Sequence, residues 1–332
     1  MGHMIALNFE DGVTRFVECA GGETVADASY RVGINIPLDC RDGACGTCRT
    51  FCESGTFDGG DYIEDALSDE EAAQGFALAC QMRPKSDLVL RIAATSELCK
   101  TKPATHQALI TAVARPSETT TMLTLDARLA FLPGQYVNID VPGRGQHRSY
   151  SFSSAPNADA EFLVRNIPGG LMTTFLASAQ PGDALQLTGP VGGFYLRDVV
   201  RPVLMLAGGT GLAPFLSMLD RLVQGGTAHP VHLVYGVTRD ADLVATDRLD
   251  AVAAALPGFS YATCVADPAS VHPRLGYVTQ HLDPAVLHGG DVDVYVCGPP
   301  PMVDAVRQHF AASGVTPASF HYEKFSPSGV TA

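Results

Sequence analysis

The 332-residue sequence has little charge, and most of that charge is of one sign. Only 17% of the residues are charged and 46% are hydrophobic, which supplies enough apolar surface for buried cores and excludes a disordered chain. Acidic residues number 35 against 22 basic ones, for a formal net charge of -13. Such a balance repels phosphate backbones and anionic lipid headgroups, so we expect neither nucleic acid nor a membrane as a partner.

The sequence also lacks the apolar segments of secreted and membrane-spanning proteins. Near the N-terminus apolar residues alternate at Ile5, Leu7 and Phe9, whereas a signal peptide has a continuous apolar core. We therefore expect a cytoplasmic protein. Residues 202–219 carry no charge, but three glycines and a proline interrupt them, which favours a buried strand, turn and helix over a membrane span.

Composition divides the chain into three predicted domains. Residues 1–97 hold 17 acidic and 7 basic side chains, and residues 98–106 are a polar linker. Residues 107–200 contain short alternating apolar runs separated by proline and glycine, which is typical of an antiparallel β-barrel. Residues 201–332 alternate apolar strands with helical stretches, which is typical of a doubly wound parallel sheet. The expected strands are 136–141, 162–167, 203–207, 231–235 and 292–297, and the expected helices are 213–223 and 302–312.

Four cysteines have the spacing C-x4-C-x2-C followed by one more cysteine 32 positions later: Cys40, Cys45, Cys48 and Cys80. This is the plant-type spacing for a 2Fe-2S cluster, and Gly43 and Gly46 let the loop fold tightly and aim N–H groups at sulfur. A structural zinc site, the main alternative, usually takes two C-x2-C pairs, and the last cysteine has no such partner. Cys19, Cys52 and Cys99 are expected as small buried hydrophobes or surface thiols.

The loop of residues 40–48 closely resembles that of plant-type ferredoxins, and the resemblance extends over residues 5–97. It implies a β-grasp fold around one 2Fe-2S cluster. The net charge of this region is -10, and its acids concentrate between residues 58 and 71. We expect this charge to help dock the domain on a basic surface of a protein partner, unless it only solvates the domain.

The segment Arg148, Ser149, Tyr150 and Ser151 resembles the R-x-Y-S flavin motif of the ferredoxin-NADP reductase superfamily. A guanidinium can bind the flavin pyrophosphate through two hydrogen bonds, a tyrosine ring can pack on the isoalloxazine, and a serine hydroxyl can reach its polar edge. An arginine and a tyrosine on alternate strand positions also occur as an ordinary surface pair. The resemblance implies FAD as a cofactor.

A second segment favours the same FAD site. Residues 165–173 end a predicted strand and open a helix, whose free N–H groups can bind a phosphate. Residues 189–194 then close the barrel, as the resemblance implies. The candidate FAD residues of the second segment are Arg165, Ile167, Gly170, Met172 and Thr173.

A glycine-rich turn follows a predicted strand and starts a helix, as a dinucleotide site requires. The candidate residues of this turn are Gly208, Gly209, Thr210 and Gly211. Pro214 stands where the common fingerprint has glycine, and the segment resembles the GGTG-x-x-P turn of the same superfamily. Its partner segment contributes Cys297, Gly298 and Pro299. The resemblance implies that Cys297 lies near the nicotinamide carbon that gives up hydride; otherwise it is a small buried residue at a strand end.

The adenosine ribose of the nucleotide is expected just after Tyr235, beside Gly236, Arg239 and Asp240. NAD sites usually place a carboxylate here, and Asp240 or Asp242 can accept a hydrogen bond from the 2′-hydroxyl. Arg239 can instead bind the 2′-phosphate of NADPH. The resemblance favours NADH.

The segment of residues 322–325 resembles the terminal segment of the superfamily, in which an aromatic ring covers the flavin until nicotinamide displaces it. The resemblance assigns this role to Phe325, although the chain runs seven residues further. The residues expected to act at the reacting atoms are Tyr150, Ser151, Cys297 and Phe325.

The order of ferredoxin, flavin barrel and nicotinamide domain resembles the reductase components of bacterial aromatic-ring-hydroxylating dioxygenases, above all those of the benzoate type. The resemblance implies an NADH-dependent oxidoreductase whose flavin converts a hydride pair into single electrons for the cluster. The implied partner is a Rieske-type terminal oxygenase, and the reductase is expected to be a monomer. Two alternatives remain: the reductase component of a soluble diiron monooxygenase, and a redox-sensing binding module.

Overall fold

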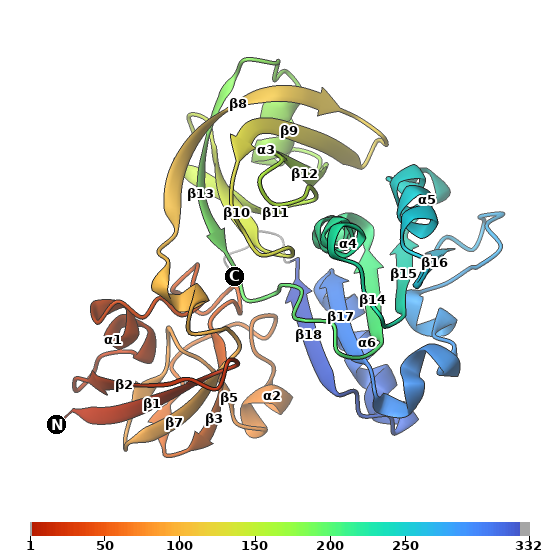
Figure 1. Ribbon diagram of the computed structural model, residues 1–332. Helices are drawn as coiled ribbons and strands as arrows, with labels where there is room; N and C mark the ends of the chain where they lie inside the picture. The colour runs from red at the N-terminus through yellow and green to blue at the C-terminus, as the bar shows by residue number, and fades with distance from the viewer. Residues whose placement is uncertain (1, 326–332) are drawn as a thin grey trace. The chain divides into compact units, whose positions relative to one another are not determined.

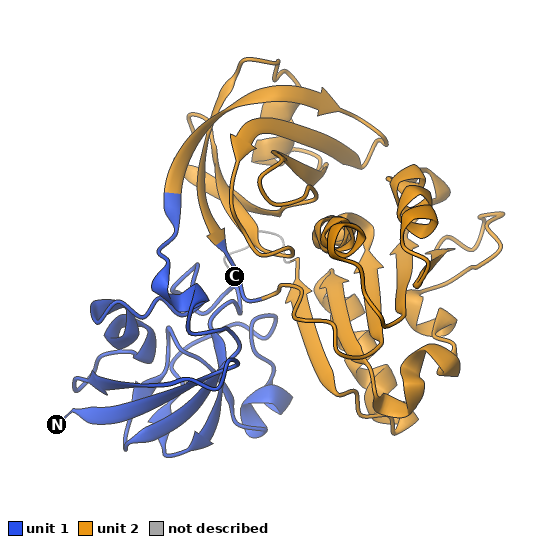
Figure 2. Cartoon of the chain, in the orientation of Figure 1, with its two compact units in different colours: residues 1–104, 191–193 blue, residues 105–190, 194–332 orange. Residues whose placement is uncertain are grey.

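The computed structural model describes residues 2–325 and divides the chain into two compact units (Figure 2). The first unit comprises Met1–Ala104 and Val191–Gly193, and the second comprises Thr105–Pro190 and Phe194–Ala332. Among the described residues, no helix is long and apolar enough to cross a membrane. The uncharged stretch 202–219 instead forms a strand, a turn and a helix, as its glycines and proline predicted.

The first unit is built on a mixed five-stranded sheet in the order β2-β1-β7-β3-β5 (Figure 1). Strand β1 runs antiparallel to β2 and parallel to the central strand β7, which is the β-grasp arrangement that the resemblance implied. The strands are β1 (His3–Phe9), β2 (Thr14–Cys19), β3 (Arg49–Ser54), β5 (Phe76–Leu78) and β7 (Leu88–Ile92), with a separate pair β4 (Phe57–Asp58) and β6 (Arg83–Pro84). The helices are α1 (Val25–Arg31), α2 (Asp69–Ala73) and the 3-10 turn η1 (Leu98–Lys100).

Alternation of apolar residues explains how this sheet forms its core. Ile5 and Leu7 are buried, and the parallel register sets them beside Leu88 and Leu90, whose side chains are buried in the same cluster. Thr24 ends the preceding turn and caps α1, because its side chain accepts a hydrogen bond from the backbone N–H of Asp27. The alternating residues Ile5, Leu7 and Phe9 thus lie in strand β1 and point into this core.

The predicted linker 98–106 contains regular structure at both of its ends. Cys99 lies in η1 and is buried in the core of the first unit. Strand β8 (Ala104–Ala114) begins within the same segment.

The second unit begins with a six-stranded antiparallel sheet in the order β11-β10-β13-β8-β9-β12. A bridge between Phe152 and Phe162 joins the two edges of the sheet and closes it as a barrel. The predicted strand 136–141 is confirmed as β10, whereas predicted 162–167 is β12, which starts and ends earlier. Besides β8, the elements are β9 (Thr120–Arg128), β10 (Tyr136–Val141), β11 (Gln146–Ser151), β12 (Asp159–Arg165), α3 (Leu171–Leu176) and β13 (Ala184–Val191).

The rest of the second unit is a five-stranded parallel sheet in the order β16-β15-β14-β17-β18. The three predicted strands are β14 (Val203–Gly208), β15 (Val231–Val237) and β17 (Asp293–Gly298), beside β16 (Phe259–Val265) and β18 (Ser319–Lys324). The helices are α4 (Ala213–Gly225), α5 (Thr246–Ala255) and α6 (Pro300–Ser313). Short 3-10 turns complete it: η2 (Gly209–Leu212), η3 (Asp240–Asp242), η4 (Val278–His281) and η5 (Pro284–Gly290).

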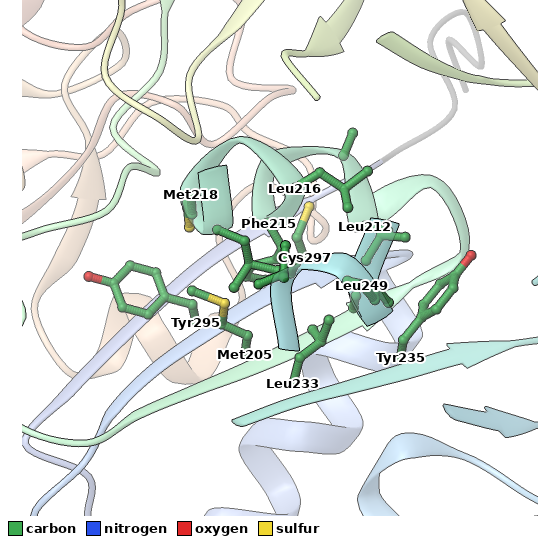
Figure 3. Packing of buried hydrophobic residues seen from close by; sticks show 14 of the residues in the cluster. Met205, Leu212, Phe215, Leu216, Met218, Leu233, Tyr235, Leu249, Tyr295 and Cys297 are labelled. Carbon is green, nitrogen blue, oxygen red and sulfur yellow. The ribbon is translucent and has the colours of Figure 1, made fainter. Parts of the chain in front are cut away.

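Helices cover both faces of this parallel sheet, as the alternation of strands and helices predicted. Along β14, Met205 faces a cluster that contains Phe215 of α4 (Figure 3). Its neighbours Leu204 and Leu206 face a second cluster that contains Val303 of α6. Because both faces are buried, the strand reads as a continuous apolar run, which is typical of doubly wound sheets.

The barrel and the parallel sheet form one unit because apolar and polar contacts join them. Leu163 of β12 packs in the same cluster as α4. Arg248 of α5 adds charged bonds: its Nη1 donates to Glu161 Oε1 of the barrel at 2.9 Å, and its Nη2 donates to Asp220 Oδ2 of α4 at 2.6 Å. The same guanidinium also donates to the backbone oxygen of Ser153. These contacts fix the barrel against the parallel sheet.

Phe215→Ala tests the core between α4 and the parallel sheet. Phe215 is fully buried, so we expect its removal to lower the free energy of unfolding by about 3–5 kcal/mol, through lost apolar burial and the cavity left behind. Urea unfolding followed by far-UV circular dichroism measures this change. Val223 lies on the same helix but is 38% exposed, and Val223→Ala should cost less than about 1 kcal/mol. Equal losses for the two variants would contradict this description of the core.

Candidate functional site

Four thiols meet in the first unit, three of them in the loop before β3 and one just after β5. The thiols of Cys40 and Cys45 lie within hydrogen-bonding range of each other, and those of Cys48 and Cys80 form a second such pair. The pairs are neighbours, since Cys45 acts electrostatically on Cys48 and Cys40 on Cys80. The structure thus brings together all four cysteines that the spacing singled out.

The arrangement in two pairs fits a dinuclear cluster. A 2Fe-2S centre contains two irons, each of which takes two thiolates. Within residues 2–325, no group of three or more His, Cys, Asp or Glu side chains is gathered as for a single metal ion. Burial raises the pKa of Cys19 to about 11 and that of Cys99 to about 12, so these two thiols have the buried environment that the sequence suggested as one possibility.

Two glycines shape the cysteine loop. Gly43 and Gly46 have φ values of +83° and +72°, in the region that favours glycine. A Cβ atom at Gly43 would lie 2.5 Å from the backbone oxygen of Asp61, and one at Gly46 would lie 2.9 Å from that of Ala66. Backbone N–H groups of the loop and of Cys80 donate to all four sulfurs. The loop therefore has the tight turns and sulfur-directed amides expected of a cluster site.

The acids near this loop differ in their surroundings. Glu71 is only 2% exposed: its carboxylate accepts from Arg49 Nη1 at 2.6 Å and also closes the N-terminal cap of α2 with Ser68. The sequence had placed Glu71 among the surface acids, and that placement was wrong because the residue following Cys48 pairs with it. The remaining exposed acids of this stretch, called the acidic rim below, are Asp58, Asp61, Glu64, Asp65, Asp69 and Glu70.

The predicted flavin motif lies on β11, at the edge of the barrel sheet. Its antiparallel register sets Arg148 opposite Ile139 and Tyr150 opposite Val137, so the two side chains project from the same face of the strand. Arg148 is half-buried, and its Nη1 donates to the backbone oxygen of His147 at 2.7 Å. Tyr150 packs against the barrel core, and burial raises the pKa of its hydroxyl.

The second predicted flavin segment is a turn followed by the six-residue helix α3. Thr173 Oγ1 accepts from the backbone N–H of Ile167 at 2.9 Å, and the N–H of Gly170 donates to the backbone oxygen of Ile167 at 2.8 Å. Arg165 and Ile167 are exposed, whereas the side chain of Met172 is buried in the barrel core. Met172 can therefore offer a ligand only its backbone.

The glycine turn between β14 and α4 approaches the end of β17 closely. A Cβ atom at Gly208 would overlap the sulfur of Met302, and one at Gly211 would overlap the backbone oxygen of Cys297. Gly209 has a φ of +56°. Since β14 is the strand at which the order of the sheet reverses, this edge is the crevice where such folds bind dinucleotides.

The other predicted residues of the dinucleotide site surround this crevice. Thr210 lies in η2 and is half-buried, and Gly298 ends β17. Pro299 is exposed and precedes α6 as its N-cap. At the end of β15, a Cβ atom on Gly236 would lie 2.8 Å from Val278 Cγ1, so the chain needs glycine there too.

A hydroxyl, a carboxylate and a thiol converge beside the glycine turn. Strand β18 pairs in parallel with β17, and the register sets Glu323 beside Cys297. Ser151 Oγ of the barrel donates to Glu323 Oε2 at 3.1 Å. Cys297 is fully buried, and both burial and the Glu323 carboxylate raise the pKa of its thiol.

Glu323 is the residue of this group that the sequence analysis did not single out. It was read only as part of the terminal segment, and 172 positions separate it from Ser151. Its place two residues before Phe325 was the only available signal. Phe325 follows β18, donates its N–H to the backbone oxygen of Gly298 at 2.8 Å, and packs against the α4 side of the sheet. Tyr150 packs against a different cluster, the core of the barrel.

The predicted ribose residues form two polar contacts after β15. Arg239 Nη2 lies 3.3 Å from Asp242 Oδ1, and Asp240 Oδ1 accepts from Ser270 Oγ at 2.7 Å. The arginine and the carboxylates that the sequence offered as alternatives are thus adjacent.

The chain matches three families of domains in one order. Residues 8–85 match the 2Fe-2S iron-sulfur cluster binding domain, residues 113–195 the oxidoreductase FAD-binding domain, and residues 205–308 the oxidoreductase NAD-binding domain. Among solved structures, the Amycolatopsis cytochrome P450 reductase is 34% identical with a TM-score of 0.71, over 98% of this chain and 100% of that one. The ferredoxin reductase in carbazole 1,9a-dioxygenase is 26% identical with a TM-score of 0.67, over 98% and 99%.

Curated relatives match over nearly the full length. The toluate 1,2-dioxygenase electron transfer component of Pseudomonas putida is 57% identical over 99% of this chain and 100% of its own. The 2-halobenzoate 1,2-dioxygenase electron transfer component of Burkholderia cepacia is 52% identical over 98% and 99%. The chain therefore belongs to the reductase, or electron transfer, components of aromatic-ring-hydroxylating dioxygenases, which are oxidoreductases with 2Fe-2S, FAD and NADH as cofactors.

Proposed function

We propose that this chain carries electrons from NADH to a Rieske-type terminal oxygenase that acts on a benzoate-like aromatic acid. The observation that carries the proposal is the convergence of Ser151, Cys297 and Glu323 beside the glycine turn, in a chain that also has two thiol pairs. When bound, FAD exchanges a hydride pair for single electrons, which the cluster accepts one at a time. Relatives named for toluate, 2-halobenzoate and anthranilate dioxygenases support an aromatic acid as the final substrate.

The residues of the barrel and of the terminal segment bind and orient FAD in this proposal. Arg148 and the helix start at residues 170–173 hold the pyrophosphate: the guanidinium is half-buried, and the backbone N–H groups of the first turn of α3 have no acceptor within the helix. Tyr150 and Phe325 would pack against the isoalloxazine when FAD is bound. Ser151 directs its hydroxyl proton at Glu323 Oε2 and so stands ready to donate to the polar edge of the flavin instead.

The edge of the parallel sheet binds NADH in this proposal. Gly208 and Gly211 let the turn pack directly against Met302 and the end of β17, and this close packing shapes the crevice proposed for the pyrophosphate. Cys297, held without charge by its burial, packs near the nicotinamide carbon that gives up hydride. The proposed domain boundaries are residues 1–97 for the ferredoxin domain, 107–200 for the barrel and 201–332 for the nucleotide domain.

We also infer that the protein is a cytoplasmic monomer. The nine cysteines are all free thiols, which suits a reducing compartment. Sedimentation of the holoprotein measures the number of chains per particle.

Cys45→Ser tests the cluster ligands. We expect this variant to lose the 2Fe-2S cluster, because a hydroxyl replaces one thiolate of the Cys40 and Cys45 pair. The contents of iron and acid-labile sulfide, together with the visible absorption of the cluster, measure the loss. Cys52 lies outside the four-thiol group and is half-buried, so Cys52→Ser should retain the cluster. Near-complete iron and sulfide in Cys45→Ser would refute the assignment.

Arg148→Ala tests the flavin site. Removal of the guanidinium should weaken FAD binding by about tenfold or more, because charge-assisted hydrogen bonds to a phosphate are lost. Flavin content after gel filtration and titration of the apoprotein with FAD measure the change. Arg144 is exposed in the turn before β11 and serves as the control, since Arg144→Ala should retain FAD. A purified Arg148→Ala protein with a full complement of FAD would rule out this role.

The acidic rim is the proposed docking surface for the oxygenase. Cys45 is the exposed member of the four cysteines, and Ile63, 48% exposed within the same stretch, donates its backbone N–H to the oxygen of Gly43. The rim therefore borders the loop from which electrons must leave. Rim charges act mainly on the association rate, so a basic surface on the oxygenase would be attracted over a Debye length of about 8 Å at physiological ionic strength.

Coupled turnover tests both the partner and the docking surface. With the purified components, NADH should support hydroxylation by a Rieske-type aromatic-acid dioxygenase and not by a diiron hydroxylase. The assay with a diiron hydroxylase is needed because two relatives, 30–31% identical, are named propane 2-monooxygenase reductase. Turnover by the diiron arm alone would contradict the proposal.

Salt separates docking from hydride transfer in the same assay. Coupled turnover should fall as ionic strength rises, whereas reduction of a small neutral acceptor needs no docking and should respond less. If both reactions show equal salt dependence, the acidic rim only solvates the domain. Rapid NADH-dependent reduction of cytochrome c would in addition exclude a purely redox-sensing module.

A further inference from the structure

The segment that follows β15 contains one arginine among several acids. Arg239 and η3 (Asp240–Asp242) lie at the carboxyl end of the strand next to β14, where dinucleotide folds place the adenosine ribose. An arginine at this place ordinarily favours the 2′-phosphate of NADPH, and a carboxylate favours the 2′-hydroxyl of NADH. Which group prevails depends on what the arginine already binds.

Asp242 already binds Arg239 at three atoms. The Arg239 guanidinium donates through Nε to Asp242 Oδ2 at 3.4 Å and through Nη2 to Oδ1 at 3.3 Å. The backbone N–H of Arg239 donates to Oδ2 at 3.1 Å. The side chain of Asp242 is 12% exposed, whereas that of Arg239 is 49% exposed, so the carboxylate is the fixed member of the pair.

The barrel holds this carboxylate in place. Thr119 lies in the turn between β8 and β9, and its Oγ1 donates to Asp242 Oδ1 at 2.7 Å. The backbone oxygen of Thr119 in turn accepts from the N–H of Asn166 at 2.7 Å. Desolvation opposes ionisation of Asp242, but the hydrogen bonds from Thr119 and Arg239 outweigh it and lower the pKa of the carboxyl. The hydrogen bond from Thr119 to Asp242 is therefore a preformed contact between the barrel and the nucleotide sheet.

Several carboxylates surround the Arg239 guanidinium. Asp242, Glu118 and Asp267 all raise the pKa of its guanidinium, the first mainly through its hydrogen bond. Asp240, the next residue, is exposed and accepts from Ser270. A 2′-phosphate carries a charge of about -1.5 to -2 and would meet this acidic group, whereas a 2′-hydroxyl would find the Asp240 carboxylate as an acceptor.

We propose that Asp242, anchored by Thr119, is a specificity-determining residue that occupies the Arg239 guanidinium and so excludes NADPH. The inference rests on the proposed function, because it takes the adenosine ribose to lie at the end of β15. In this proposal Asp242 does not bind the ribose itself. It binds the Arg239 guanidinium, and the neighbouring Asp240 is the carboxylate that binds the 2′-hydroxyl.

Asp242→Asn is the direct test in the full-length holoprotein. Asparagine keeps the size of the side chain and an oxygen for Thr119, but it gives up the charge that holds Arg239. The ratio of kcat/KM for NADPH to that for NADH, with ferricyanide as acceptor, should rise about tenfold or more, as expected for freeing one charged hydrogen-bonding group. Inhibition by 2′,5′-ADP should strengthen relative to inhibition by 5′-AMP.

A second variant tests whether the gain runs through the arginine. In Asp242→Asn combined with Arg239→Ala, the gain for NADPH should disappear, because no cation is left to bind the phosphate. Thr119→Val should shift the ratio in the same direction by less, and it keeps the test available if Asp242→Asn folds poorly. Asp159 pairs with Arg128 on the barrel surface, so Asp159→Asn should leave the ratio unchanged.

Three outcomes overturn the proposal. A wild-type preference for NADPH would do so, as would an unchanged coenzyme ratio in Asp242→Asn and Thr119→Val proteins with intact flavin and cluster absorption. Persistence of the gain in the double variant would show that the arginine is not involved. Failure of the proposed function looks different: the wild-type protein would then oxidise neither coenzyme, or would oxidise NADH without coupling to an oxygenase.

Discussion

The redox site depends on one strand pairing, that of β18 with β17. Its parallel register sets Glu323 beside Cys297, and the bond from Phe325 N to the oxygen of Gly298 extends the register one residue past the strand. Because successive residues of a strand face opposite sides, a slip of one position would turn Glu323 away from both Cys297 and Ser151. The same slip would move Phe325. In our proposal, the last strand of the sheet therefore determines which groups can meet the flavin and the nicotinamide.

That pairing is useful only because the barrel is held against the sheet. Leu163 of the barrel packs among the apolar side chains of α4, but apolar contact has no preferred direction. Directional contacts come from Arg248, which bonds Glu161 and Asp220 together, and from Thr119, which bonds Asp242. Hydrogen bonds to charged groups fix distance and angle, so these two contacts orient the barrel on the sheet. In our proposal, Asp242 then serves both coenzyme choice and domain orientation.

The sequence predicted those features that are local. Cysteine spacing identified the four thiols, alternation identified strands such as β10 and β14, and glycines identified the turn at Gly208 and Gly211. The contact of Glu323 with Ser151, 172 positions away, was not predicted, because no pattern along the chain encodes such a pair. The same holds for the contacts of Arg248 with Glu161 and Asp220, which lie 87 and 28 positions away. Glu71 was misplaced for a related reason: an acid in an acidic stretch looks exposed until the fold brings Arg49 to it.

In our proposals, negative charge selects both the protein partner and the coenzyme, and the two effects act over different distances. The acidic rim is exposed and, in our proposal, acts on the oxygenase before contact, across a range comparable to a Debye length of about 8 Å. Asp242 is mostly buried and acts on Arg239 at 3.3 Å, well inside that length. Salt therefore weakens the attraction between proteins but has little effect on the Asp242 and Arg239 pair. The excess of acidic over basic residues can thus attract the oxygenase at long range and exclude the 2′-phosphate of NADPH at short range.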